Sequence, residues 1–182
     1  MALFGYSAFE SRLVTGCAIL WKGLDPLSRA IRVFSRFSHA SLVVRIEEYQ
    51  GTKDQVFLTE SLASGIELRS LWERIQNYNG QVFIFTPSWL TPEIQDKIGS
   101  FALQECAKNV PYSYGGLFAN ILGHVSQHAR RWFCSQFVWE AYIENAPAIN
   151  FKPTPKAPRP GDIPVWTHGT LDEIDVPRSD HA

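Results

Sequence analysis

Apolar runs broken by turn residues dominate the first half of the sequence. Runs rich in Val, Ile, Phe and Trp that end at Gly, Pro, Asn or Asp are typical of strands. On this pattern we predict five strands, over residues 14–21, 39–49, 56–61, 65–71 and 81–87. A sixth strand, at an edge of the sheet, is predicted over residues 165–168.

Helical spacing of apolar residues appears between these runs. Asp25 and Pro26 suit the cap and first turn of a short helix. Its apolar stripe consists of Leu27, Ala30, Ile31 and Phe34. Thr91 and Pro92 begin a second helix that runs to about Asn109. One side of this second helix carries Ile94, Ile98, Phe101, Ala102 and Cys106.

Two further helices are predicted in the second half, over residues 117–124 and 130–147. In the latter, the inward side holds Cys134, Phe137, Val138 and Ala141, because these positions follow helical spacing. We therefore expect an α+β fold, a small and mostly antiparallel sheet packed by helices. A single domain is expected over residues 1–182, with a proline-rich loop at 150–165 and a mobile tail at 172–182.

Composition excludes several classes of protein. The formal net charge of -1 argues against nucleic acid or an anionic membrane as the main partner. No apolar run reaches the roughly 18–20 residues that span a bilayer, and no secretion signal is visible. We expect a cytoplasmic protein, with release by lysis or by a route that leaves no signal as alternatives. The oligomeric state stays open.

Three cysteines without a CxxC motif indicate a reducing compartment rather than a disulfide framework. Cys17 and Cys106 are predicted to be small core residues. Cys134 is different because it lies near a helix start, where free N–H groups and the helix dipole favour a thiolate. No metal and no cofactor are expected, since His124 and His128 lie four residues apart without a third ligand in range.

His39 is the candidate base for Cys134, because it stands at the start of a strand between two small residues. Glu60 ends a neighbouring strand-like run and could fix the tautomer of His39. Each residue also has an ordinary interpretation. A cysteine near a helix start is often a core residue, and a lone histidine or glutamate at a strand end is often structural or exposed.

Four segments together resemble a known family: FSHASLVV (37–44), LTES (58–61), PYSYGG (111–116) and WFCSQFVWEAY (132–142). Their order is similar to that of the circularly permuted NlpC-type papain-like hydrolases, in the YiiX-like branch. The resemblance implies that Cys134 is the nucleophile, His39 the base and Glu60 the residue that orients it. It also places Tyr112 beside the cysteine, where its hydroxyl would help to form the oxyanion hole.

The sequence departs from the family pattern at three positions. Gln136 and Phe137 stand where an acidic residue and a leucine are common, and Ser113 replaces a usual acidic residue. The nucleophile is unaffected, but any role of the missing carboxylate at Ser113 is in doubt.

The resemblance implies a thiol hydrolase that cleaves amide bonds, such as those of cell-wall peptides, through an acyl-enzyme. Relatives of the permuted fold also include acyltransferases and thioesterases that act on lipid-like acyl groups. The aromatic residues Trp132, Phe133 and Trp139 would suit an acyl chain, although they are also ordinary packing residues. A binding module that keeps the fold without turnover is the third alternative. The substrate is thus expected to be a small peptide or an acyl-bearing molecule.

The proline-rich segment from Phe151 to Pro164 follows the cysteine helix and must return to the sheet. We predict that it passes one end of the active-site groove, with Phe151 as its anchor. The alternative is a plain connector.

Overall fold

A computed structural model describes residues 9–47, 55–62, 64–76, 78–108, 134–147, 149, 151 and 158–174. Its strands are β1 (Ala18–Gly23), β2 (His39–Ile46), β3 (Gln55–Leu62), β4 (Gly65–Ser70), β5 (Gly80–Pro87) and β6 (Gly169–Ile174). Its helices are α2 (Pro26–Arg32), α3 (Leu71–Gln76), α4 (Pro92–Lys108), α6 (Cys134–Asn145) and α7 (Ile163–Thr167).

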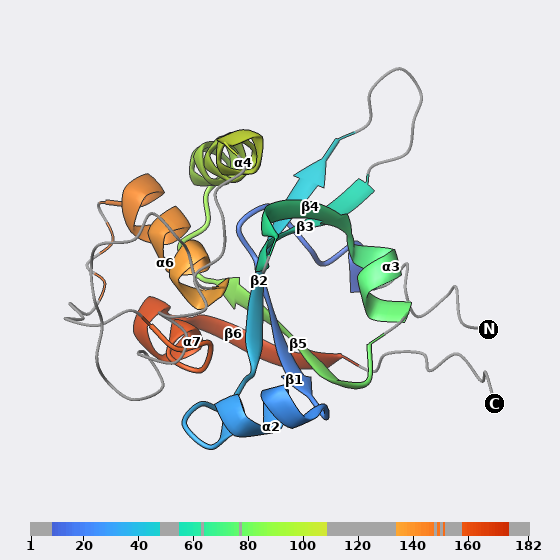
Figure 1. Cartoon of the computed structure of the whole chain (residues 1–182). Coiled ribbons are helices and arrows are strands. Elements are labelled where there is room, and N and C mark those ends of the chain that lie inside the picture. The colour runs from blue at the N-terminus through green and yellow to red at the C-terminus, as the bar shows by residue number, and fades with distance from the viewer. Residues whose placement is uncertain are drawn as a thin grey trace.

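The six strands form one sheet in the order β4-β3-β2-β1-β5-β6. Every neighbouring pair is antiparallel. This confirms the α+β class and the antiparallel sheet that the sequence predicts. Figure 1 shows the twisted sheet between two layers of helix, with α4 and α6 on one side and α3 on the other.

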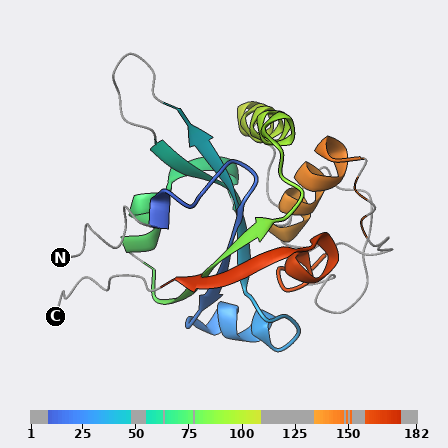
Figure 2. The ribbon, with the colours of Figure 1, turned by 180° about the vertical axis from the view of Figure 1, so that it is seen from behind.

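Both faces of the sheet are covered, so the central strands are apolar on both sides. The face toward α4, α6 and α7 holds a core that includes Leu42, Phe85, Phe137 and Tyr142. The opposite face packs against α3 and the segment around Leu13. The view from behind in Figure 2 shows the same two layers.

The two long helices follow the sequence prediction closely. Thr91 caps α4, since its Oγ1 accepts a hydrogen bond of 3.3 Å from the Ile94 amide. Ile98 and Ala102 are buried against the sheet, and Ile94, Phe101 and Cys106 pack beside them. Cys106 is only partly buried, however, so its prediction as a core residue is correct only in part. In α6, Cys134, Phe137, Val138 and Ala141 are all buried, as predicted.

The first strand and the first helix differ from the prediction. β1 begins at Ala18 rather than at residue 14, because Gly16 takes a φ of 94° in a turn that the Cys17 amide closes onto the Val14 carbonyl. Asp25 caps α2 as predicted, with its Oδ1 2.9 Å from the Ser28 amide. Yet none of the residues of α2 is buried, so its apolar stripe is not part of the buried core.

The C-terminal part needs two corrections. Residues 163–167 form helix α7, not an edge strand, with Pro164 in the first turn, where a missing N–H costs nothing. Residues 169–174 form β6, so the predicted tail from residue 172 includes half of a paired strand. These residues form a strand because β5 is apolar and would otherwise be an unprotected edge of the sheet. The pairing of Leu171 with Phe85 covers that edge.

Several predictions fall outside the described residues: the helix at 117–124, Tyr112, and the tail beyond residue 174. Helix α3 was not predicted at all. None of the described helices is long and apolar enough to cross a bilayer.

Candidate active site

His39 lies where the sheet opens. It is the first residue of β2 and pairs with Trp21 of β1. On its other side, the ladder between β2 and β3 ends at Leu42 and Thr59, although β3 continues to pair with β4 up to Leu62. The two strands therefore separate at the His39 end. Side chains from β3, α3 and α6 meet His39 in the opening.

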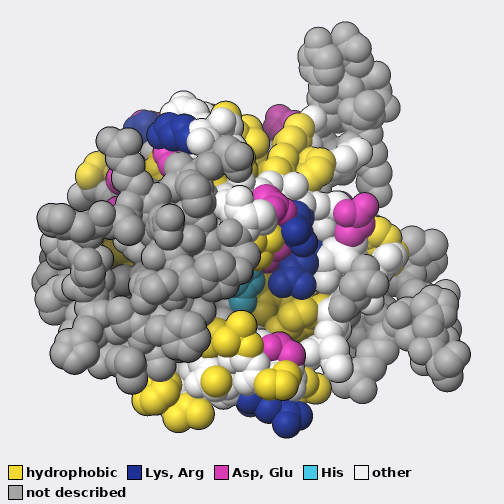
Figure 3. All heavy atoms as spheres, viewed as in Figure 1, with side chains coloured by type: hydrophobic (Ala, Val, Ile, Leu, Met, Phe, Trp, Pro, Cys, Tyr) yellow, Lys and Arg dark blue, Asp and Glu magenta, His cyan; other side chains and the backbone are white. Residues whose placement is uncertain are grey.

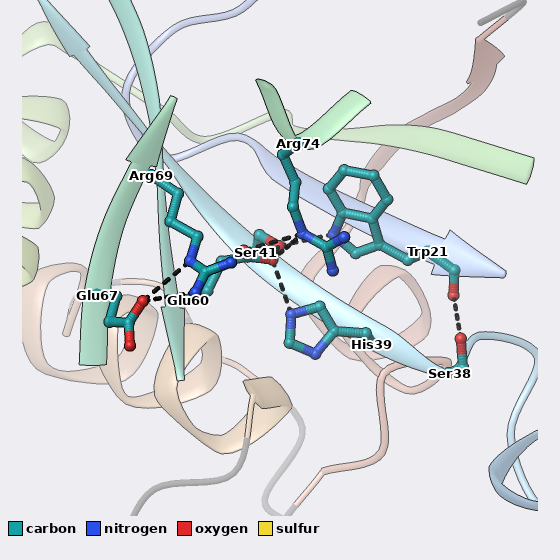
Figure 4. A network of polar contacts seen from close by, with 8 residues as sticks. All are labelled: Trp21, Ser38, His39, Ser41, Glu60, Glu67, Arg69 and Arg74. Atoms are coloured by element: carbon teal, nitrogen blue, oxygen red, sulfur yellow. Dashed lines mark hydrogen bonds and ion pairs between the residues drawn. The ribbon is translucent and has the colours of Figure 1, made fainter. Parts of the chain in front are cut away.

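Glu60 is the buried centre of the polar network in Figure 4. Its side chain is 0% exposed. Its Oε1 lies 2.9 Å from His39 Nε2 and accepts a hydrogen bond of 2.6 Å from Ser41 Oγ. Arg74 Nε lies 3.1 Å from Oε2. Burial alone would raise the pKa of Glu60, but the hydrogen bond and charge of His39, then Arg74 and Ser41, lower it to about 2.

A second layer holds Glu60 and Arg74 in place. Trp21 Nε1 donates a hydrogen bond of 2.6 Å to Ser41 Oγ, so the Ser41 hydroxyl proton is directed at Glu60. The Arg74 guanidinium lies 4.7 Å from the centroid of the Trp21 ring and 5.5 Å from that of Tyr78. Such stacking fixes the plane of the guanidinium and thus the direction of its N–H groups.

Cys134 begins α6 and is 5% exposed. Burial alone would raise the pKa of its thiol, but the charge and hydrogen bond of His39 outweigh burial and lower the pKa. The backbone N–H groups of Ala40 and Ser135 add to this lowering by hydrogen bonding to the sulfur. Ala40 can contribute because the β2–β3 ladder ends before it reaches this residue.

His39 connects the thiol to the carboxylate. Since Glu60 occupies Nε2, Nδ1 is the ring nitrogen left for Cys134. Burial alone would lower the pKa of His39. The charge and hydrogen bond of the Cys134 thiolate, followed by those of Glu60, raise the pKa to about 9. A lowered thiol pKa beside a raised imidazole pKa favours a thiolate–imidazolium pair near neutral pH.

The other two cysteines have the opposite electrostatics. Burial raises the pKa of Cys17, and burial together with the charge of Glu105 raises that of Cys106 to about 11. Of the three thiols, only Cys134 has a lowered pKa, which separates it from the residues predicted to be structural.

The structure thus brings together three of the four predicted site residues: Cys134, His39 and Glu60. Tyr112 lies outside the described residues, so its place is not established. Sequence reasoning missed Arg74 and Ser41. Ser41 carried a signal, because alternation along a strand places it on the same face as His39. Arg74 carried none, because it belongs to an unpredicted helix of six residues.

The described ends of the proline-rich segment flank α6. Ser135 Oγ donates a hydrogen bond of 2.6 Å to the Pro158 carbonyl, next to the nucleophile candidate. Phe151 packs against Trp139 and Trp89, with ring centroids 5.6 Å and 5.3 Å away. Phe151 thus has the packing contacts expected of an anchor. The path of the segment past the active-site groove stays a prediction, because residues 152–157 are outside the described residues.

This arrangement is suited to nucleophilic chemistry. It places a buried thiol of lowered pKa beside an imidazole of raised pKa, and it adds a carboxylate that orients the imidazole. Within the described residues, no group of three or more His, Cys, Asp and Glu side chains is placed to hold a metal ion.

Comparison with known proteins supports the fold but not a family. The sequence matches no protein-family model and no curated protein. Among solved structures, the chain is similar to the metalloprotein YiiX of Escherichia coli O157:H7, described under DUF1105. The TM-score is 0.57 at 20% sequence identity, and the match covers 74% of this chain and 67% of YiiX. At that identity the likeness shows a shared fold: the described chain has a YiiX-like α+β architecture.

Proposed function

We propose that this protein is a thiol hydrolase of the permuted papain-like type that cleaves amide bonds through an acyl-enzyme. One observation carries the proposal: Cys134, His39 and Glu60 form a continuous chain of contacts in which the thiol pKa is lowered and the imidazole pKa is raised. Structural cysteines have no need of such a partner, as Cys17 and Cys106 demonstrate.

The proposed reaction has two steps. The Cys134 thiolate attacks the carbonyl carbon, and the C–N bond breaks as His39 gives its proton to the leaving nitrogen. Water, deprotonated by His39, then attacks the acyl-enzyme, and the thiolate leaves. Glu60 holds the His39 ring and stabilises its charged form. The Cys134 backbone N–H, together with Tyr112 as implied by the resemblance, would bind the oxyanion.

The proposal is tested by the reactivity of Cys134. We expect iodoacetamide to alkylate Cys134 far faster than Cys17 or Cys106 at pH 7, and the rate to persist well below the ordinary thiol pKa of 9. Peptide mass spectrometry after timed quenching measures each site. His39→Ala should shift the pH midpoint of Cys134 alkylation upward, because the thiolate loses its largest stabilising partner.

Turnover is tested with p-nitrophenyl acetate. This activated ester acylates a thiolate whatever leaving group the natural substrate carries. A burst of p-nitrophenol in the wild type, absent in Cys134→Ser, is the expected result. Equal alkylation rates for all three cysteines, with no burst, would contradict the thiol hydrolase. The remaining interpretation would be a binding module that keeps the fold.

An acyltransferase or thioesterase is the second candidate, and exposed apolar residues in the cavity beside His39 and around the neighbouring helix α2 favour it. Leu27 is 54% exposed and Phe34 46% exposed on and just after α2. Leu24, also exposed, lines the same cavity as His39. A rising rate of acyl-enzyme formation along p-nitrophenyl acetate, hexanoate and decanoate would favour this candidate over a peptide amidase.

A metal centre fits this site poorly, although YiiX is described as a metalloprotein. The Glu60 oxygens are already bonded to His39, Ser41 and the Arg74 cation. A divalent ion at Glu60 would meet a guanidinium at hydrogen-bond distance. The proposed reaction therefore has no metal-dependent step, and we expect a chelator to leave Cys134 acylation unchanged.

A further inference from the structure

A cavity of about 380 Å³ opens beside His39. His39 and Arg74 line it from β2 and α3, Asp25 and Leu24 from the α2 end, and Tyr78 from the turn before β5. Figure 3 shows this face, where a histidine side chain lies near dark blue basic side chains, and a recessed apolar surface separates these from an acidic side chain below. The volume suits a small organic group.

The cavity lies on the histidine side of the candidate nucleophile. His39 is part of its wall, whereas Cys134 is not among the described residues that line it. In the reaction proposed above, His39 gives its proton to the leaving nitrogen at the moment the C–N bond breaks. The group departing with that nitrogen must therefore lie next to His39, and among the described residues this cavity borders His39.

Arg74 supplies the charge that would recognise this group. Only its Nε is bonded to Glu60, at 3.1 Å from Oε2 and 3.3 Å from Oε1. Its terminal nitrogens make no hydrogen bond to any described residue, and Figure 4 shows them turned away from Glu60. The side chain is 26% exposed, and stacking on Trp21 and Tyr78 fixes its plane. A fixed guanidinium fork of this kind matches a carboxylate in two parallel hydrogen bonds.

Asp25, from the α2 end of the cavity, carries the opposite charge. Hydrogen bonds from the Ser28 side chain and amide lower the pKa of Asp25, so this carboxyl is ionised at neutral pH. A carboxylate in the cavity is thus attracted to the Arg74 end and repelled from the Asp25 end, which gives the bound group one orientation.

We infer that this cavity is the leaving-group subsite and that it takes an amine bearing a carboxylate, of the amino-acid type, with Arg74 as its ligand. The inference rests on the proposed function, because it assigns a substrate class to the same Cys134–His39 chemistry. In the reverse direction, the subsite accepts an amino acid that attacks the acyl-enzyme. The C–S bond then breaks, an amide C–N bond forms, and the proton of the attacking nitrogen passes to His39.

The test uses this reverse step, so that acylation does not depend on the cavity. Cys134 is acetylated with p-nitrophenyl acetate and offered glycine, which carries a carboxylate, or glycinamide, which carries a neutral amide at the same position. Because the two amines differ in basicity, each rate is divided by the rate at which that amine reacts with p-nitrophenyl acetate without protein. Chromatography measures acetylated amine against acetate, with each rate normalised to the concentration of unprotonated amine. We expect the normalised rate for glycine to be about tenfold higher than that for glycinamide, because one charge-assisted hydrogen bond contributes about this factor.

Variants identify the ligand. Arg74→Gln should abolish the preference for glycine. The matched control Arg69→Gln, which removes an exposed arginine paired with Glu67 outside the cavity, should keep it. Because the preference is a ratio within one variant, any loss of overall rate through the contact of Arg74 with Glu60 cancels.

The two proposals fail in different ways. If Cys134 is not acetylated, the proposed function is wrong and the subsite falls with it. If Cys134 is acetylated but glycine and glycinamide react equally in the wild type, the subsite is wrong and the thiol chemistry stands. That wild-type comparison decides the question even if Arg74→Gln cannot be acetylated.

Discussion

Glu60 shows how a buried carboxylate can stay charged. Desolvation of an isolated carboxylate would push its pKa upward. Here His39, Ser41 and Arg74 each place a positive charge or a hydrogen bond on one of its two oxygens. Since removing one member leaves the others buried without a partner, this network should be sensitive to single substitutions.

The first prediction concerns acid stability. The pKa of Glu60 is lowered from 4.5 to about 2, so its contribution to folding is fully present above pH 4.5 and is lost as the pH falls toward 2. The linkage amounts to about 3 kcal/mol. Glu60→Gln should therefore flatten the dependence of unfolding free energy on pH between 4.5 and 2.

Urea denaturation at several pH values measures this effect. The variant should be less stable than the wild type at pH 7 and should approach it at pH 2.5. A wild type and a Glu60→Gln variant that lose stability in parallel across this window would contradict the lowered pKa.

At the residue scale, the sequence predicts the positions of Cys134 and His39 better than it predicts the residues around them. Helical spacing of Phe137, Val138 and Ala141 places Cys134 inward at a helix start. The position of His39 follows from the predicted strand, which begins at this residue. Arg74 could not be predicted, because its role depends on a contact between α3 and β3 that no local pattern encodes.

At the scale of elements, α6 must be held so that Cys134 meets His39. Besides apolar packing on β2 and α4, one buried polar contact ties α6 to the start of β1: the Tyr142 hydroxyl donates a hydrogen bond of 2.9 Å to the Gly16 carbonyl. The Tyr142 ring also contacts Trp89 edge to face, at 5.0 Å between centroids. The C-terminal half of α6 is therefore clamped while its first residue carries the thiol.

The second prediction follows from this clamp. Tyr142→Phe keeps the ring but leaves the Gly16 carbonyl without its hydroxyl partner, which should cost about 1–3 kcal/mol of unfolding free energy. Thermal or urea unfolding measures the loss. Cys134 alkylation at 25 °C should stay near the wild-type rate, because the ring still packs. A stability within 0.5 kcal/mol of the wild type, taken as about the level of a neutral surface change, would argue against the hydrogen bond.

Elements with a strong local pattern are the ones that the sequence predicts. β2, β3, β5 and α4 have long periodic runs and clear end signals. α3 has six residues and α7 five, too few for helical periodicity to show. β6 is half polar and follows a helix, so only its pairing with β5 gives it a strand conformation.

For the whole molecule, β6 completes the sheet next to the apolar strand β5. Four consecutive residues of β5, from Val82 to Phe85, are buried. Arg12 and Asp172 form an ion pair of 2.5 Å that also connects β6 to the N-terminal segment.

The third prediction tests that role. Deleting residues 169–182 should expose the edge of β5, lower the unfolding free energy and promote aggregation. Deleting residues 175–182 alone is the matched control, since it leaves β6 intact. Size-exclusion chromatography and denaturation of the two truncated chains compare them directly. Equal behaviour of the two would show that β6 contributes little to the sheet.

The chain order of the site has a consequence for biosynthesis. β1 to β5 and α3 all precede Cys134, so the ribosome delivers His39, Glu60 and Arg74 before the thiol. A domain generally folds as a unit, so the site can assemble only after α6 has been synthesised. Until α6 docks, Cys134 lacks the contacts to His39 and Ala40 that lower its pKa. We therefore expect the nascent cysteine to behave as an ordinary thiol, slow to oxidise, until α6 docks and encloses it.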